Sequence, residues 1–258
     1  MELNQDKNSK CQLLDNDGWY RFDNDKVTIF WHLNPIDYIA LNSHGHCDIF
    51  SFILYYKGYP IIVDPGCYSY MSDNFSIYGK TASAHNVFTI DNFGLSPLPR
   101  FIYPPRYRKL KSSFEWNELN NGFYFKISSD GFLRISKELT AFREFYLTMN
   151  NLRIRDFLNG KGMHNVKTYF HFAPDTKINY QENSDFRNME LEVGGNKIEF
   201  HVEDFLHKTS IKILSGIREP KPAGWFFPKY GEALPLKTCI IESCSQFPYD
   251  EQYILTFK

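Results

Sequence analysis

Short runs of alternating apolar and polar residues recur along most of the chain, for example at residues 27–32, 123–128 and 252–257. In an extended strand successive side chains point to opposite faces, so this two-residue period predicts β-strands with one buried face. Asparagine, aspartate and glycine interrupt the runs at short intervals, as is typical of turns between consecutive strands. No long window of helical period with capping residues interrupts them.

The composition agrees with this pattern. Aromatic residues make up 17% of the chain, and they favour strands. We therefore predict an all-β fold, a large antiparallel two-sheet β-sandwich. A chain of 258 residues can hold one large β-domain or two smaller ones. No repeat or long linker divides it, so we expect a polar tail over residues 1–14 and one domain over residues 15–258.

Charge and targeting signals exclude several classes of protein. The formal net charge of -1 gives no reason to expect binding to nucleic acid or to an anionic membrane. A near-neutral total still permits a local basic cleft for an acidic sugar chain. No apolar run approaches the roughly 18 to 20 residues of a membrane span. The polar start shows no signal-peptide core. The five cysteines are an odd number without a C-x-x-C pair, so we expect no disulfide framework, and the compartment stays open.

Candidate chemistry is concentrated between residues 42 and 91. His46, Asp64 and His85 each fall at the expected end of a strand, and Asp64 runs directly into Pro65-Gly66, where a strand must stop. Two imidazoles and a carboxylate suit zinc or another divalent metal and leave a position for water or substrate. We therefore predict a metal site formed by these three residues.

His44 lies two residues before His46, so in an extended chain both rings project to the same face. One ring could then bind metal while its neighbour transfers a proton near its ordinary pKa. The alternative is that each histidine is an ordinary surface or strand-end residue. From spacing alone both interpretations stay open, because ligands on strands leave no compact signature like that of a zinc finger.

Several motifs of this stretch occur together in one known family. They are H-x-H-x-D at 44–48, V-D-P-G at 63–66, Y-S-Y at 68–70 and A-H-N at 84–86. In this order they resemble the C-terminal β-domain of heparinase II/III family polysaccharide lyases. D-N-D-G-W-Y-R-F at 15–22 and G-W-F-F-P-K-Y-G-E at 224–232 extend the resemblance over most of the chain.

The resemblance implies a lyase that cleaves uronate-containing polysaccharide by β-elimination. It implies that His44 is the catalytic residue of this domain, and that His46, Asp64 and His85 hold a structural metal that fixes the wall of the cleft. In similar enzymes a helical toroid supplies the remaining catalytic groups, and this sequence contains no toroid. We therefore expect an acidic polysaccharide as partner, a toroid supplied in cis or in trans, and a parent protein that is periplasmic or secreted.

Other residues of the stretch are weaker candidates. Tyr70 and Tyr78 could contact sugar rings or pack at the rim of the sandwich, and Lys80 stands where the family often has arginine. Arg100, Arg106 and Arg108 lie on a proline-rich segment that could line a groove or be a surface loop. The alternative function is a non-catalytic polysaccharide-binding or structural module whose metal is purely structural.

Overall fold

The computed structural model describes residues 10–14, 18–33, 45–97, 111–180, 187–203 and 209–258. His44 and the Arg100, Arg106 and Arg108 segment lie outside these residues, so their predicted roles stay predictions. Antiparallel strands dominate the described chain, which confirms the all-β prediction. The strands are β1 (Lys10–Leu14), β2 (Trp19–Asp23), β3 (Val27–His32), β4 (Phe52–Tyr56), β5 (Tyr59–Ile62), β6 (Phe88–Ile90), β7 (Ser112–Leu119), β8 (Gly122–Ser129), β9 (Thr140–Thr148), β10 (Asn151–Asn159), β11 (Met163–His171), β12 (Lys177–Asn179), β13 (Asn188–Val193), β14 (Asn196–Glu203), β15 (Thr209–Ser215), β16 (Trp225–Phe226), β17 (Leu234–Pro235), β18 (Lys237–Gln246) and β19 (Tyr249–Phe257).

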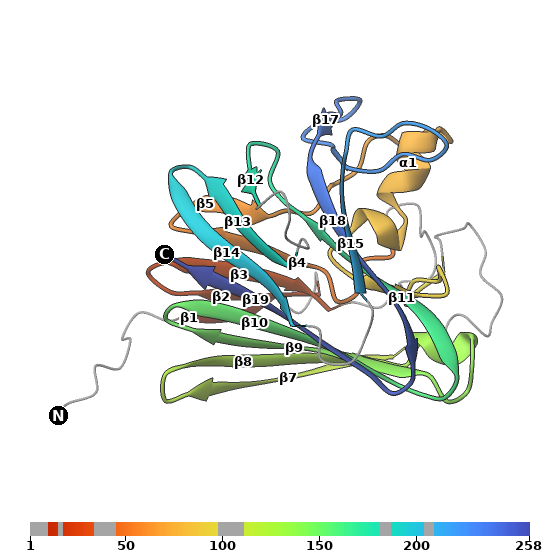
Figure 1. Ribbon diagram of the computed structural model, residues 1–258, viewed down its shortest axis with the longest axis horizontal. Coiled ribbons are helices and arrows are strands. Elements are labelled where there is room, and N and C mark those ends of the chain that lie inside the picture. The colour runs from red at the N-terminus through yellow and green to blue at the C-terminus, as the bar shows by residue number, and fades with distance from the viewer. Residues whose placement is uncertain (1–9, 15–17, 34–44, 98–110, 181–186, 204–208) are drawn as a thin grey trace.

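One layer of the fold is an eight-stranded sheet in the order β12-β13-β14-β19-β10-β9-β8-β7 (Figure 1). Strand β10 alternates strictly between buried and more accessible residues, as the two-residue period of its sequence predicts. The helical structure is limited to α1 (Asn74–Gly79) and the short 3₁₀ turns η2 (Ala82–Ala84) and η4 (Gly131–Arg134) within the described residues.

The opposing layer consists of two sheets, β1-β2-β3-β4-β5 and β15-β18-β11-β6. They meet where β5 passes the end of β11. The Ala173 N–H donates to the Ile61 carbonyl at 3.0 Å, and the Val63 N–H donates to the His171 carbonyl at 2.9 Å. The sandwich prediction is therefore confirmed, with the difference that one of its two layers is divided into two sheets.

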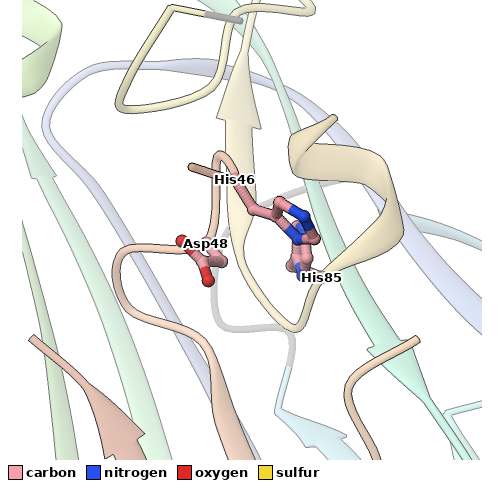
Figure 2. A group of neighbouring side chains, drawn as sticks. All are labelled: His46, Asp48 and His85. Carbon is pink, nitrogen blue, oxygen red and sulfur yellow. The ribbon is translucent and has the colours of Figure 1, made fainter. Parts of the chain in front are cut away.

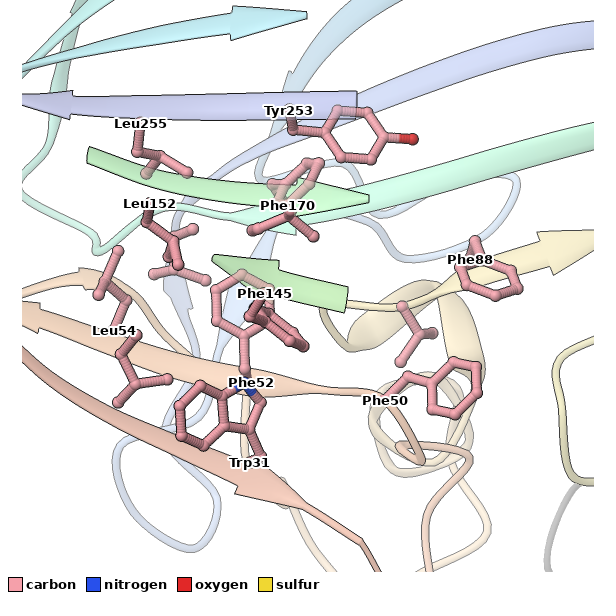
Figure 3. Packing of buried hydrophobic residues seen from close by; sticks show 14 of the residues in the cluster. Trp31, Phe50, Phe52, Leu54, Phe88, Phe145, Leu152, Phe170, Tyr253 and Leu255 are labelled. Carbon is pink, nitrogen blue, oxygen red and sulfur yellow. The ribbon is translucent and has the colours of Figure 1, made fainter. Parts of the chain in front are cut away.

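The core lies between these layers and is rich in aromatic rings (Figure 3). Trp31 of β3 stacks on Phe125 of β8 with ring centroids 4.3 Å apart. At the other end Phe170 of β11 packs edge-on against Tyr253 of β19 at 4.9 Å. Each such side chain contributes about 1.5–3 kcal/mol when fully buried, so both halves of the divided layer are held on the eight-stranded sheet.

Asn86 fastens the junction between the two sheets of the divided layer. Its Nδ2 donates to the carbonyls of Phe52 and Val63, both at 2.9 Å, and its Oδ1 accepts from the His171 N–H at 2.8 Å. A buried side chain with all these bonds made fixes the strand ends relative to one another. The residue next to it in the chain is His85, so the junction also positions the candidate metal centre.

Candidate metal centre

His46, Asp48 and His85 lie together at this junction, with one potential ligand atom of each residue within 4.8 Å of the others (Figure 2). The ring centroids of His46 and His85 are 5.2 Å apart. The His85 side chain is completely buried. Two imidazoles beside a carboxylate fit zinc and similar divalent metals, so the residues present are compatible with the predicted metal.

The local fold that delivers His85 is specified by short-range chemistry. Asp73 caps α1 by accepting a hydrogen bond from the Ser76 N–H at 2.9 Å. Gly79 at the end of α1 lies close to the backbone of the Pro65-Gly66 segment, so that an added Cβ would be 3.2 Å from the Gly66 carbonyl oxygen. After the η2 turn the chain is extended at His85. The histidine therefore enters the junction from a segment with little freedom to move.

Asp64 contacts His85 directly. Its Oδ2 is 2.7 Å from His85 Nδ1, and its Oδ1 accepts the Gly66 N–H at 3.0 Å. Two arrangements are compatible with this distance. Asp64 can accept the Nδ1 proton and so leave Nε2 for the metal, which is the common outer-shell arrangement. Alternatively Asp64 and Nδ1 are both ligands, because two donors on one zinc ion lie about 3 Å apart.

Of the predicted trio, the structure therefore brings His46 and His85 together and places Asp64 on His85. Asp48 was not predicted as a ligand. Its position two residues after His46 was the available signal, since residues two apart share a face of an extended segment. The assignment of Asp64 as a ligand stays a prediction, with Asp48 as the second carboxylate that could take the place.

Burial and neighbouring charges shift the pKa values of the histidines in and around this group. Burial and the nearby His85 lower the pKa of His46 to about 4, so this imidazole is neutral near pH 7. Burial alone would lower the pKa of His85, but the Asp64 carboxylate outweighs it and raises this pKa. His32 is paired with Asp48 at 3.1 Å, and although burial opposes the effect, this carboxylate raises the pKa of His32. A neutral His46 is the protonation state that binds metal.

His171 lies beside this group at the end of β11 and is also completely buried. Neither of its ring nitrogens has a hydrogen-bond partner among the described residues. Burial lowers its pKa to about 3, so the ring is neutral at ordinary pH. A neutral and unpaired imidazole in the interior makes the fold sensitive to acid.

The three predicted substrate-binding residues have different environments. Tyr70 is 59% exposed, and its ring centroid is 6.0 Å from that of Tyr230, which is 66% exposed. Tyr78 is only 4% exposed and packs edge-on against Phe227. A ring buried in this way offers no face to a sugar, so the packing interpretation of Tyr78 is favoured. Lys80 follows α1, and its carbonyl accepts the Cys47 N–H at 3.0 Å, which ties it to the loop that carries His46.

Tyr230 is a candidate that the sequence reasoning did not single out. It lies between β16 and β17, in a segment that two hydrogen bonds join to residues 65–68, just after Asp64. The Phe227 N–H donates to the Pro65 carbonyl and the Gly231 N–H donates to the Tyr68 carbonyl, both at 2.8 Å. The same hairpin packs beside α1 in Figure 1. The G-W-F-F-P-K-Y-G-E motif contained this tyrosine, but its spacing gave no indication of its exposure.

Solved structures with the same fold include polysaccharide lyases. The heparan sulfate lyase HepC from Pedobacter heparinus matches with a TM-score of 0.73 and 15% identity, covering 96% of this chain and 36% of that chain. A heparinase III matches with a TM-score of 0.72 and 13% identity, covering 97% of this chain and 36% of that chain. The chain therefore spans about a third of the length of these lyases. At such identities the likeness shows the fold.

No match was found among curated proteins. No helix within the described residues is long and apolar enough to cross a membrane. The sequence does match the family described as heparinase II/III-like, C-terminal, over residues 6–247. The chain belongs to the heparinase II/III-like C-terminal family.

Proposed function

We propose that this chain is the metal-binding C-terminal domain of a lyase that cleaves uronate-containing polysaccharide by β-elimination. The observation that carries the proposal is the convergence of His46 and His85 with the partly buried carboxylates of Asp48 and Asp64. Family membership supports a lyase domain. The polysaccharide is proposed to be acidic, because a carboxylate next to C5 is what makes the C5 proton removable.

In the proposed reaction a base takes the C5 proton of the uronate. The C5–H electrons form the C4=C5 double bond, and the bond from C4 to its glycosidic oxygen breaks. The leaving oxygen then receives a proton from an acid. His44 is proposed for one of these proton transfers. A toroid in cis or in trans is proposed to supply the other groups.

His46 and His85 are proposed to hold the metal with Asp64, or with Asp48 in its place. A bound zinc ion supplies a fixed positive centre that locks its ligands and leaves a position for water or an exogenous ligand. We propose that a metal on His46 would anchor the chain two residues after His44 and so help to position the catalytic histidine. The metal is proposed to be mainly structural.

Metal binding is the direct test of this site. Elemental analysis of protein prepared without chelator should show near one equivalent of zinc or another divalent metal. His85→Ala should lose it, and a strong chelator should lower the melting temperature of the wild type because ligands assembled by tertiary structure bind well only in the native state. Asp48→Asn and Asp64→Asn identify which carboxylate matters more.

The matched control is His164→Ala. His164 forms the same kind of pair, with its Nδ1 2.7 Å from Asp91 Oδ2, at a place remote in the sequence from the candidate centre. This variant should keep the metal. If His85→Ala retains as much metal as the wild type, the assignment of the site is wrong.

Substrate contact can be tested separately on the exposed tyrosine pair. Tyr70→Ala should weaken binding of uronate oligosaccharides roughly fivefold, since loss of an aromatic contact of about 1 kcal/mol changes Kd by that factor. Tyr230→Ala should act in the same direction, whereas the buried Tyr78→Phe should bind normally. Calorimetric titration measures these constants. Equal affinity of all four proteins would remove Tyr70 from the binding surface.

A further inference from the structure

We propose that Arg143 is a positioning residue for the candidate metal centre, which it serves by holding the backbone of both segments that carry His46 and His85. Arg143 lies on β9, on the face turned into the sandwich, and its side chain is completely buried. This inference rests on the proposed function, since it concerns the same site.

One side of the guanidinium is neutralised by an aspartate on the neighbouring strand. Arg143 Nε and Nη2 donate to the two carboxylate oxygens of Asp156 at 2.5 and 2.7 Å. Asp156 lies directly opposite Arg143 in the register of β9 and β10. Both side chains are fully buried, so the pair is rigid, oriented and shielded from water.

The remaining nitrogen, Nη1, bonds to the backbone next to the candidate centre. Arg143 Nη1 donates to the carbonyl oxygen of Asn86 at 2.5 Å and to that of Phe50 at 3.3 Å. Asn86 is the residue after His85, and Phe50 is two residues after Asp48. One planar group therefore bonds to the backbone of both segments, and the planar fork of arginine allows this while a lysine ammonium cannot reproduce it.

The backbone at Phe50 shows why such a bond is needed. Phe50 has φ 78°, in the left-handed region that a bulky side chain rarely adopts. Such a conformation persists only where surrounding contacts over-determine it. The hydrogen bond from Arg143 to the Phe50 carbonyl is one of these contacts. Another is the packing of the Phe50 ring against the Phe88 ring, with centroids 5.6 Å apart.

Stability alone is a poor reason for this ion pair. Replacing both partners of a buried pair with apolar residues of similar volume is often neutral or stabilising, whereas removing one partner leaves an unpaired buried charge. This difference separates a positioning role from a merely structural one. A double replacement should preserve the fold and still release the two segments.

The test compares Arg143→Met/Asp156→Leu with a matched control on the same sheet. Arg155 on β10 binds Asp250 on β19 through Nε and Nη2 at 2.8 and 2.6 Å, in the same two-bond arrangement. Its other hydrogen bond within the described residues goes to Glu144, and it contacts neither segment of the centre. Arg155→Met/Asp250→Leu therefore removes an ion pair of the same geometry, in a more exposed position, without touching the site.

The first measurement is amide hydrogen exchange on metal-free protein. In the Arg143 double variant, exchange should accelerate at least tenfold at Ser51 and Asn86. In the wild type the Ser51 amide donates to the Asp48 carbonyl at 2.8 Å, and the Asn86 amide donates to Ser51 Oγ at 3.2 Å. Amides of the β9–β10 pair should keep their protection, and the Arg155 control should match the wild type at both positions.

The second measurement is zinc affinity by competition with a chromophoric chelator. The Arg143 double variant should bind roughly 10- to 100-fold more weakly, as is typical when support of ligands is lost, and the control should be unchanged. If the double variant does not fold, Arg143→Lys, which keeps a positive charge beside Asp156, must show the same local acceleration.

These measurements separate the two hypotheses. A wild type that binds no zinc contradicts the metal site of the proposed function, while the exchange measurement still decides the role of Arg143. Unchanged exchange at Ser51 and Asn86 in a folded Arg143 variant overturns the inference even if the wild type binds zinc. Acceleration in the Arg155 control as well would reduce the effect to a general loosening of the sheet, and this outcome would also overturn it.

Discussion

The isolated chain should be several orders of magnitude slower in cleaving uronate polysaccharide than a longer polypeptide that carries the same domain behind a helical toroid. Elimination needs a base at C5, an acid at the leaving oxygen and donors that stabilise the carboxylate as it becomes enolate-like. The proposed contribution of this domain is one proton-transfer group, His44. Acid–base groups and oxyanion donors each contribute on the order of 10² to 10⁴-fold to the rate. A domain that lacks several of these groups loses the product of their contributions.

The same reasoning predicts that His44→Ala cripples the longer polypeptide. The loss should be on the order of 10² to 10⁴-fold in kcat/KM, the contribution of one proton-transfer group. The measurement is ultraviolet absorbance of the unsaturated product on a panel of uronate polymers, with His164→Ala as a control outside the site. Robust turnover by the isolated chain would contradict the division of the catalytic set between two domains. Full activity of His44→Ala with metal retained would favour the alternative, a non-catalytic module with a structural metal.

Acidification of the metal-free protein should remove several kcal/mol from its free energy of unfolding between pH 6.5 and pH 4. The folded-state pKa of His171 is lowered to about 3, below its ordinary value of 6.5. A depressed pKa contributes stability that is present above the unfolded-state pKa and is lost as pH falls towards the folded-state value. For His171 the loss is about 3 kcal/mol by pH 4, at 1.36 kcal/mol for each pH unit below 6.5.

His46, with a pKa lowered to about 4, adds a loss in the same window. Three other groups do not cancel it. The raised pKa values of His32 and His85 give stability that is already complete below pH 6.5 and is lost only as pH rises. The pKa of Asp64 lies below this pH range. Burial alone would raise this pKa, but the charge of His85 outweighs burial and lowers it.

Denaturant unfolding at pH 7 and pH 4.5 measures this dependence, and two variants locate its source. His171→Leu should flatten the profile, because the ring nitrogens that it removes have no hydrogen-bond partner among the described residues. His201→Leu, at a partly accessible position where Nδ1 is 2.6 Å from Asn188 Oδ1, should keep the wild-type slope. If His171→Leu loses as much stability as the wild type over this range, the acid sensitivity has another origin.

Much of the fold was determined by local sequence. The two-residue alternation marked β3, β8 and β19 because a strand has only two faces, and burial of one face imposes the period. Pro65 predicted a strand end near Asp64, because proline has no N–H for the ladder, and β5 ends close by at Ile62. These are short-range consequences of backbone geometry, so they can be read without knowledge of the partners of a strand.

The composition of the centre depended on tertiary structure. His46 and His85 are 39 positions apart in sequence numbering, and only the junction of two sheets brings their rings within 5.2 Å. The ligand types could be predicted from chemistry, and the motif order indicated which residues to consider. The proximity of Asp48 and the direct contact between Asp64 and His85 depend on how two loops approach each other, and no residue spacing encodes that approach.

Burial was decided by tertiary structure in the same way. Tyr70 and Tyr78 are similar candidates in sequence, but one lies on the surface and the other in an aromatic cluster, because the β16–β17 hairpin covers only one of them. Arg143 occupies an ordinary inward position of a strand, where an apolar residue is the expected choice. The sequence by itself determined most of the strands, the family and the candidate ligands, but not β1 (Lys10–Leu14), which lies in the segment predicted as a polar tail. The packing of sheets far apart in the chain decided which side chains meet, because contacts between layers depend on three-dimensional distance and not on local period.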